Sequence, residues 1–162
     1  IEAKMRDRYE PLSQLNDYRT GLIELMEKQK YNGNLTLQFN SGAIPLDAMQ
    51  SIAFEFMQRF EKRAWGRAHE KIKPYERFHG IFFPENMETN SRHLHAHIKF
   101  ADTLMTRRTP TELQTIAKAI FKGLYPGGTL DLHFFTPENW RKYATKEWFD
   151  AGDFAERYFL VA

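Results

Sequence analysis

The residues from His93 to Phe100 alternate strictly between polar and apolar side chains, and no other feature constrains the fold as much. Histidines stand at every second position from His93 to His97, and the residues between them are apolar. Successive side chains of a β-strand point to opposite faces of its sheet. We therefore predict a strand over 93–100 whose apolar side chains face a hydrophobic core, while its imidazoles share the other face.

Other segments show the periodicity of strands or helices. Alternation and short apolar runs predict further strands over 35–39, 77–83 and 130–135. Helical spacing and end signals predict helices over 12–30, from Pro45 to Ala64, from Thr109 to Leu124 and over about 137–150. Strands 77–83 and 93–100 form a central hairpin joined by the polar loop 86–91. Helices segregated over a mostly antiparallel sheet define an α+β fold.

The composition excludes several classes of protein. A chain of 162 residues fits one domain with a real core, and its start at Ile rather than Met indicates an excised domain. No apolar stretch approaches twenty residues and no secretory leader begins the chain, so no membrane contact is expected. The chain has no cysteine, so a metal ion must be held by His, Asp or Glu.

The charge pattern is open to two interpretations. The net charge is only +2, but seven Lys or Arg stand against three acidic residues between Arg59 and Arg77. The pairs Arg107–Arg108 and Arg141–Lys142 are further basic clusters. Such clusters can bind phosphates, or they can form a solvated helix face.

The histidine strand is a candidate metal site. Residues two apart on a strand lie about 7 Å apart, so two of its imidazoles can converge on one divalent ion. Three histidines in strict alternation favour metal binding over a polar sheet surface. Glu85, at the end of the preceding strand, is expected to lie beside them, with a solvated loop acid as the alternative. Two nitrogens and a carboxylate suit Mn²⁺ or Mg²⁺, and zinc accepts the same set.

Tyr143 is a candidate nucleophile on the predicted last helix. It lies off the apolar stripe of that helix, one turn from Lys146. A phenol that attacks a phosphodiester must lose a proton with an ordinary pKa near 10, and the charge on the phosphate must be neutralised. Lys146 can assist either requirement. The alternative is an exposed Tyr–Lys pair with no chemical role.

In combination these segments resemble the HUH endonucleases, above all the rolling-circle replication initiators of circular single-stranded DNA viruses and of related plasmids and phages. The matching motifs are the apolar strand 35–40, His-hydrophobic-His at 93–95 and Tyr-x-x-Lys at 143–146. The resemblance covers roughly residues 34–150. It implies one domain over 1–162 with an RRM-like, five-stranded antiparallel sheet and flanking helices, to which helix 12–30 is an addition.

The resemblance also implies the roles of the site residues. Glu85, His93 and His95 would hold Mn²⁺ or Mg²⁺, with His97 as an alternative ligand through the pair His95/His97. Tyr143 would attack single-stranded DNA with help from Lys146, leaving a 5′-phosphotyrosine and a 3′-hydroxyl that primes replication. Reversal of the step rejoins the strand.

The implied partner is single-stranded DNA at a replication origin. The basic side chains expected to contact it are Arg59, Arg63, Arg67, Arg92, Lys99, Arg107, Arg108 and Lys142. The sequence contains no phosphate-binding loop of the Gly-x-x-x-x-Gly-Lys-[Ser/Thr] type, so a helicase would act in trans or in a further C-terminal domain. The expected location is the bacterial cytoplasm, or the nucleus for a viral element. The alternatives are a non-catalytic single-stranded nucleic-acid-binding module, a zinc hydrolase, and a relaxase or transposase of the same superfamily.

Overall fold

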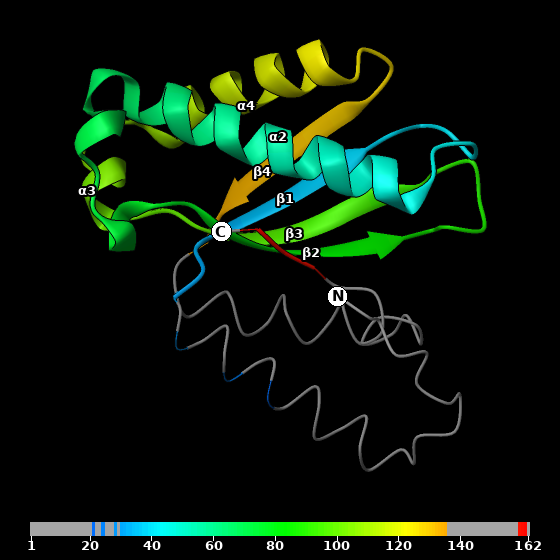
Figure 1. Ribbon diagram of the computed structural model, residues 1–162, viewed down its shortest axis with the longest axis horizontal. Helices are drawn as coiled ribbons and strands as arrows, with labels where there is room; N and C mark the ends of the chain where they lie inside the picture. Colours follow the sequence, from blue (N-terminus) through cyan, green and yellow to red (C-terminus); the bar gives the residue numbers. More distant parts are fainter. Residues whose placement is uncertain (1–20, 22–23, 25–27, 29, 136–158, 162) are drawn as a thin grey trace.

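The computed structural model describes residues 30–135 and 159–161 and the single positions 21, 24 and 28. Its centre is a five-stranded sheet in the order β4-β1-β3-β2-β5, and all neighbouring strands are antiparallel. The strands are β1 (Gly33–Gln38), β2 (His79–Glu85), β3 (His93–Lys99), β4 (Thr129–Phe134) and β5 (Phe159–Val161). The histidine strand β3 therefore lies in the middle of the sheet, between β1 and β2 (Figure 1).

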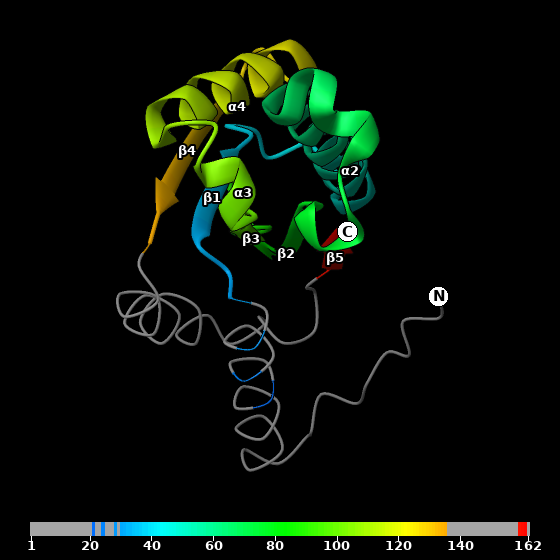
Figure 2. The same cartoon turned by 90° about the vertical axis from the view of Figure 1, so that its left-hand side faces the viewer.

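Two long helices, α2 (Leu46–Trp65) and α4 (Pro110–Leu124), cover one face of this sheet (Figures 1 and 2). The α4 helix begins with Pro110 after Thr109, whose side chain accepts a hydrogen bond from the Glu112 backbone N–H. The Glu112 side chain accepts in return from the Thr109 backbone, which completes a capping box. The short helices η1 (Gly66–Lys71), η2 (Pro74–Glu76) and α3 (Asp102–Met105) lie in the connections.

The core fills the space between the helices and the sheet. On β3 the side chains of Leu94, Ala96 and Ile98 are fully buried in it. Phenylalanine rings form much of the rest and meet mostly edge to face, as Phe60 does with Phe78 at 5.1 Å between centroids. Close packing on this face holds the backbone of β3 in one register, and so fixes the positions of the side chains on its opposite face.

The predicted α+β class is confirmed, as are the four longer strands and both helices that fall in the described ranges. The main shift is that β2 begins at residue 79 rather than 77 and continues to Glu85. The elements η1, η2, α3 and β5 were not predicted individually. The predicted helix 137–150 and, apart from single positions, the predicted helix 12–30 lie outside the described residues. None of the helices in the described ranges is both long and apolar enough to cross a bilayer.

Candidate metal centre

The histidine side of β3 faces away from α2 and α4. Because Leu94, Ala96 and Ile98 enter the core, the alternating imidazoles project from the opposite face of the sheet. Across the pairing with β2, Glu85 lies opposite His93, Phe83 opposite His95 and Ile81 opposite His97. Glu85 is therefore in the same row of the sheet as His93, as the hairpin predicted.

Glu85 and His93 are in direct contact. His93 Nε2 donates a hydrogen bond to Glu85 Oε2 over 2.5 Å, and Nδ1 donates to the Ser91 carbonyl over 3.1 Å. The hydrogen bond to Glu85 raises the pKa of His93 above its ordinary value, against the effect of burial. Because a carbonyl only accepts, Ser91 keeps the proton on Nδ1. Loss of the other proton then leaves a lone pair on Nε2, directed at Glu85, which is the tautomer of a metal ligand held by a backbone carbonyl.

His95 and His97 are more deeply placed. His95 is buried, and burial lowers its pKa to about 4, so its ring is neutral near pH 7. His97 is fully buried, and burial lowers its pKa well below the ordinary value. The two ring centroids lie 5.8 Å apart. A neutral imidazole is the form that binds metal, and of these two rings His95 lies nearer the row of Glu85.

The donor set fits a divalent cation in its chemistry, and two of its members already meet. Ligand atoms about 2.1 Å from an octahedral ion lie about 3 Å from each neighbouring ligand atom. The contact between Glu85 Oε2 and His93 Nε2 is a direct hydrogen bond, so these two atoms would have to separate slightly to hold an ion between them. Within the described ranges, no three His, Cys, Asp or Glu side chains already form a ligand group. A three-ligand site that includes His95 therefore requires its ring to lie closer to Glu85 and His93 than it does here.

Most of the basic residues predicted to contact DNA lie on the helix side of the sheet. Arg59, on α2, is exposed and paired with Glu55. Arg107 stacks over the Trp65 ring, with its guanidinium carbon 5.8 Å from the ring centroid. Arg63 and Arg67 are exposed at the end of α2 and on η1. The structure thus does not bring these side chains together with the histidines.

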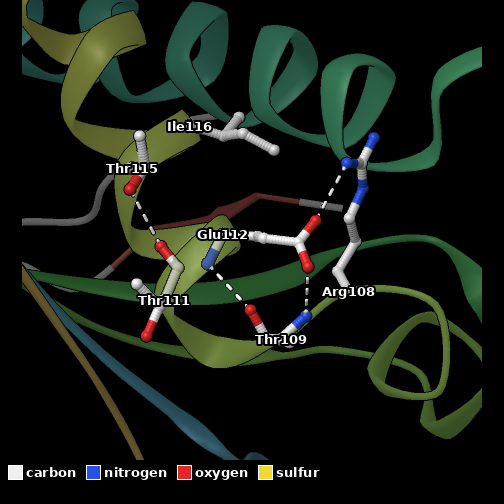
Figure 3. Close-up of a pocket in the computed structure, with 6 residues that line it drawn as sticks. All are labelled: Arg108, Thr109, Thr111, Glu112, Thr115 and Ile116. Atoms are coloured by element: carbon white, nitrogen blue, oxygen red, sulfur yellow. Dashed lines mark hydrogen bonds and ion pairs between the residues drawn. The ribbon is translucent and has the colours of Figure 1, made fainter.

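Arg108 lines a shallow depression at the start of α4 (Figure 3). Its guanidinium donates to the Ala64 carbonyl and to Glu112, which also accepts from Thr109. The polar groups drawn in Figure 3 are thus joined to one another rather than directed at a common point. This depression lies on the helix side of the sheet, away from the histidines of β3, and its polar groups are already bonded to one another.

The remaining predicted site residues lie near β3 or outside the described part. Arg92 precedes β3 and donates to the Ile44 carbonyl. Lys99 ends β3 opposite His79, on the histidine face but far along the strand from Glu85. Tyr143, Lys146 and Lys142 lie outside the described residues.

The sequence analysis missed the three polar residues of β1 on the histidine face, which are Asn34, Thr36 and Gln38. Gln38 lies opposite His93, and Thr36 lies opposite His95. The available signal was the alternation of β1, in which Leu35 and Leu37 enter the core and the polar residues between and after them do not. Comparison with known proteins adds no relative, because no family model, no curated protein and no solved structure matches the chain.

Proposed function

We propose that the chain is a metal-dependent HUH-type endonuclease that nicks single-stranded DNA with Tyr143 and initiates rolling-circle replication of a plasmid, phage or virus-like element. The observation that carries the proposal is the pair Glu85–His93, with His93 anchored on the Ser91 carbonyl and His95 next to it on the same face. A polar sheet surface needs no such anchored carboxylate–imidazole pair. In metal sites, by contrast, a ligating imidazole almost always donates its other ring N–H to a fixed acceptor, as His93 does to Ser91.

In this proposal Glu85, His93 and His95 hold Mn²⁺ or Mg²⁺. When bound, the ion supplies Lewis-acid polarisation of a phosphoryl oxygen. The phenol oxygen of Tyr143 forms a bond to phosphorus and loses its proton to a base. The bond from phosphorus to the 3′-oxygen breaks, and that oxygen takes up a proton as a 3′-hydroxyl. Lys146 offsets negative charge on the phenolate or on the phosphate.

The basic side chains contact the rest of the DNA in two groups. Arg92 and Lys99 lie on either side of the three histidines, whereas Arg59, Arg63, Arg67, Arg107 and Arg108 lie on the helix side. The helix-side group therefore contacts flanking DNA rather than the scissile phosphate, by attraction to the backbone that salt weakens. A helicase in trans or in a further domain would unwind the duplex at the nick.

The test is covalent capture of DNA. The full chain is incubated with Mn²⁺ and a fluorescent single-stranded DNA library of random sequence, and adducts are separated on a denaturing gel. We expect a Mn²⁺-dependent adduct whose DNA maps to Tyr143 by mass spectrometry. Tyr143→Phe removes the attacking oxygen and abolishes it. Tyr75→Phe is the matched control, because Tyr75 is 67% exposed on η2 and its loss leaves the adduct unchanged.

Two results separate this function from its alternatives. Persistence of the adduct in Tyr143→Phe refutes the assignment of the nucleophile. Tight binding of the library without metal, unchanged in Glu85→Ala and with no adduct, identifies a non-catalytic single-stranded nucleic-acid-binding module instead.

A further inference from the structure

The two flanks of the histidine strand differ on the metal-site face. On the β2 flank, Glu85 stands opposite His93, but the next position toward the middle of the strand is the buried Phe83. On the β1 flank, the same two rows hold Gln38 and Thr36. A straight row therefore runs Gln38–His93–Glu85, and the row beside it runs Thr36–His95–Phe83.

The β1 flank is the polar and accessible one. Gln38 and Thr36 are both partly exposed, whereas Phe83 is 1% exposed. In the part of the chain that the structure describes, no hydrogen bond joins the Gln38 amide or the Thr36 hydroxyl to another side chain or to the backbone. Hydrogen-bonding groups on the surface of a strand, in the rows of a metal site and without a partner among the described residues, are available to a ligand of that site.

The reach and the chemistry of these two side chains match a phosphodiester. Residues directly opposite each other on antiparallel strands have Cβ atoms about 5 Å apart, so a Gln side chain is long enough to reach a ligand bound at its neighbour. The amide of Gln38 offers two N–H donors and the hydroxyl of Thr36 one. Neither carries a negative charge that would repel a phosphate, and both can donate to non-bridging oxygens.

We propose that Gln38 and Thr36 form the phosphate-binding wall of the site, donating hydrogen bonds to the non-bridging oxygens of the phosphodiester held beside the ion. This inference rests on the proposed function, because it takes the Glu85–His93–His95 set as the metal ligands. It assigns the β2 flank to metal binding and the β1 flank to substrate binding.

The experiment measures phosphodiester binding separately from cleavage. The probe is the dinucleotide TpT, and the readout is the paramagnetic relaxation of its ³¹P resonance by Mn²⁺ bound to the full chain. Manganese affinity is measured in parallel by electron paramagnetic resonance. The variants Gln38→Met and Thr36→Val keep side-chain size but remove the donors. Gln58→Ala is the control, because Gln58 is an exposed amide on α2, on the other side of the sheet.

We expect Gln38→Met to weaken TpT binding about tenfold, as loss of a hydrogen bond to a charged group does. We expect a smaller loss in Thr36→Val and none in Gln58→Ala. Manganese affinity stays within about twofold in all three, since none removes a ligand in the proposed set. Unchanged TpT binding in Gln38→Met overturns the inference. A loss of manganese affinity as large as that of His93→Asn also overturns it, because Gln38 would then belong to the metal ligands.

The two proposals fail in distinguishable ways. If the wild-type chain forms the Tyr143 adduct but Gln38→Met binds TpT normally, the nickase stands and the wall does not. If the wild-type chain binds TpT in a Mn²⁺-dependent and Gln38-dependent manner but forms no adduct, the phosphate-binding role of Gln38 is supported and the nickase activity is refuted. Absence of any Mn²⁺-dependent TpT binding by the wild-type chain overturns the wall.

Discussion

The molecule contains two glutamate–histidine pairs with the same separation along the chain, and they differ in what else surrounds the carboxylate. Glu61 of α2 bonds His69 of η1 over 2.9 Å, and Glu85 of β2 bonds His93 of β3 over 2.5 Å. Each pair spans eight residues. Both carboxylates are largely buried, with side-chain exposures of 10% and 19%.

The Glu61 carboxylate is saturated by the protein. Besides His69, it accepts from Arg77 over 3.0 Å and from the backbone N–H of Phe78 over 2.8 Å. These bonds join α2, η1 and the segment that enters β2. Both oxygens of this carboxylate therefore accept hydrogen bonds from the protein, which indicates a structural role for the pair.

The Glu85 carboxylate has only His93 as a hydrogen-bonding partner among the described residues. Its second oxygen accepts no hydrogen bond from any residue that the structure describes, and the His93 ring is oriented by a carbonyl rather than by a second carboxylate. The same residue pair at the same spacing therefore forms a structural contact between elements in one place and a candidate metal-ligand pair in the other. The number of donors around the carboxylate distinguishes the two.

The largest expected effect is on stability, from Glu61→Ala. The change leaves the Phe78 N–H buried without an acceptor and Arg77 and His69 without their carboxylate, so we expect a loss of about 3 kcal/mol in the free energy of unfolding. Urea titration measures it, with Glu55→Ala of the exposed pair with Arg59 as control, at about 0.5 kcal/mol or less. Equal stability of the two variants would contradict a structural role. Manganese affinity stays at the wild-type value in both.

The second effect is on metal affinity, from Glu85→Ala. Loss of a ligand oxygen weakens manganese binding about a hundredfold, or about 2.7 kcal/mol. Stability in EDTA falls by about 1 kcal/mol, because only one hydrogen bond is lost. Isothermal titration calorimetry and urea unfolding measure the two quantities. Glu88→Ala, an exposed acid of the adjacent loop, is the matched control. A large loss of stability without a change in metal affinity would place Glu85 in the same class as Glu61.

The third effect is a pH dependence of metal affinity. The pKa of His93 is raised above 6.5 by its hydrogen bond to Glu85, so a proton competes with the ion at Nε2. Manganese affinity should therefore rise with pH, by at most about tenfold per unit, until pH exceeds that raised pKa. His95, with a pKa of about 4, adds no competition at neutral pH. Calorimetric titrations across this range measure the slope.

The stability of the metal-free protein should depend on pH in the opposite direction to manganese affinity, which provides a check. A histidine whose folded pKa is raised contributes stability that is fully present below its unfolded pKa, near 6.5, and is lost as pH rises through the folded value. In EDTA, the free energy of unfolding should therefore fall over that window, and Glu85→Gln should reduce the fall. A metal affinity that does not change with pH would refute proton competition at His93.

Local patterns were sufficient to predict one side of the site. The alternation from His93 to His97 placed the imidazoles on one face, and the short loop after Glu85 placed this acid beside them. Helix α4 was predictable because Thr109, Pro110 and Glu112 are start signals within one turn. Each of these features is set by neighbours along the chain.

Long-range pairing was not predictable in the same way. Nothing local to β1 specifies that Gln38 pairs with His93, because the choice of partner strand and register depends on the packing of the whole sheet. The Glu61 network joins α2 to the segment before β2 through contacts up to 17 residues apart. The charge pattern gave the basic clusters but not their face, and β5, with three residues, is too short to show a period.

The smallest expected effect comes from His97→Asn and decides between the two ligand pairs. His97 lies between Asn34 and Ile81, two rows away from Glu85, and is fully buried. A ligand set that includes Glu85 and His93 leaves His97 outside the reach of the ion. We therefore expect the manganese affinity of His97→Asn to stay within about threefold of the wild-type value, because His97 neither binds the ion nor orients a ligand in the proposed set.

His93→Asn is the matched comparison, because it makes the same substitution on the same face of β3, at the position opposite Glu85. If His97→Asn weakens manganese binding as much as His93→Asn, the ion is bound further along the strand, with His95 and His97. Urea unfolding in EDTA separates that outcome from a general loss of folding. Replacing a metal ligand removes the stabilisation that comes from bound metal, and this stabilisation is absent in EDTA. A weakening by His93→Asn alone confirms that the unsaturated glutamate–histidine pair is where the ion binds.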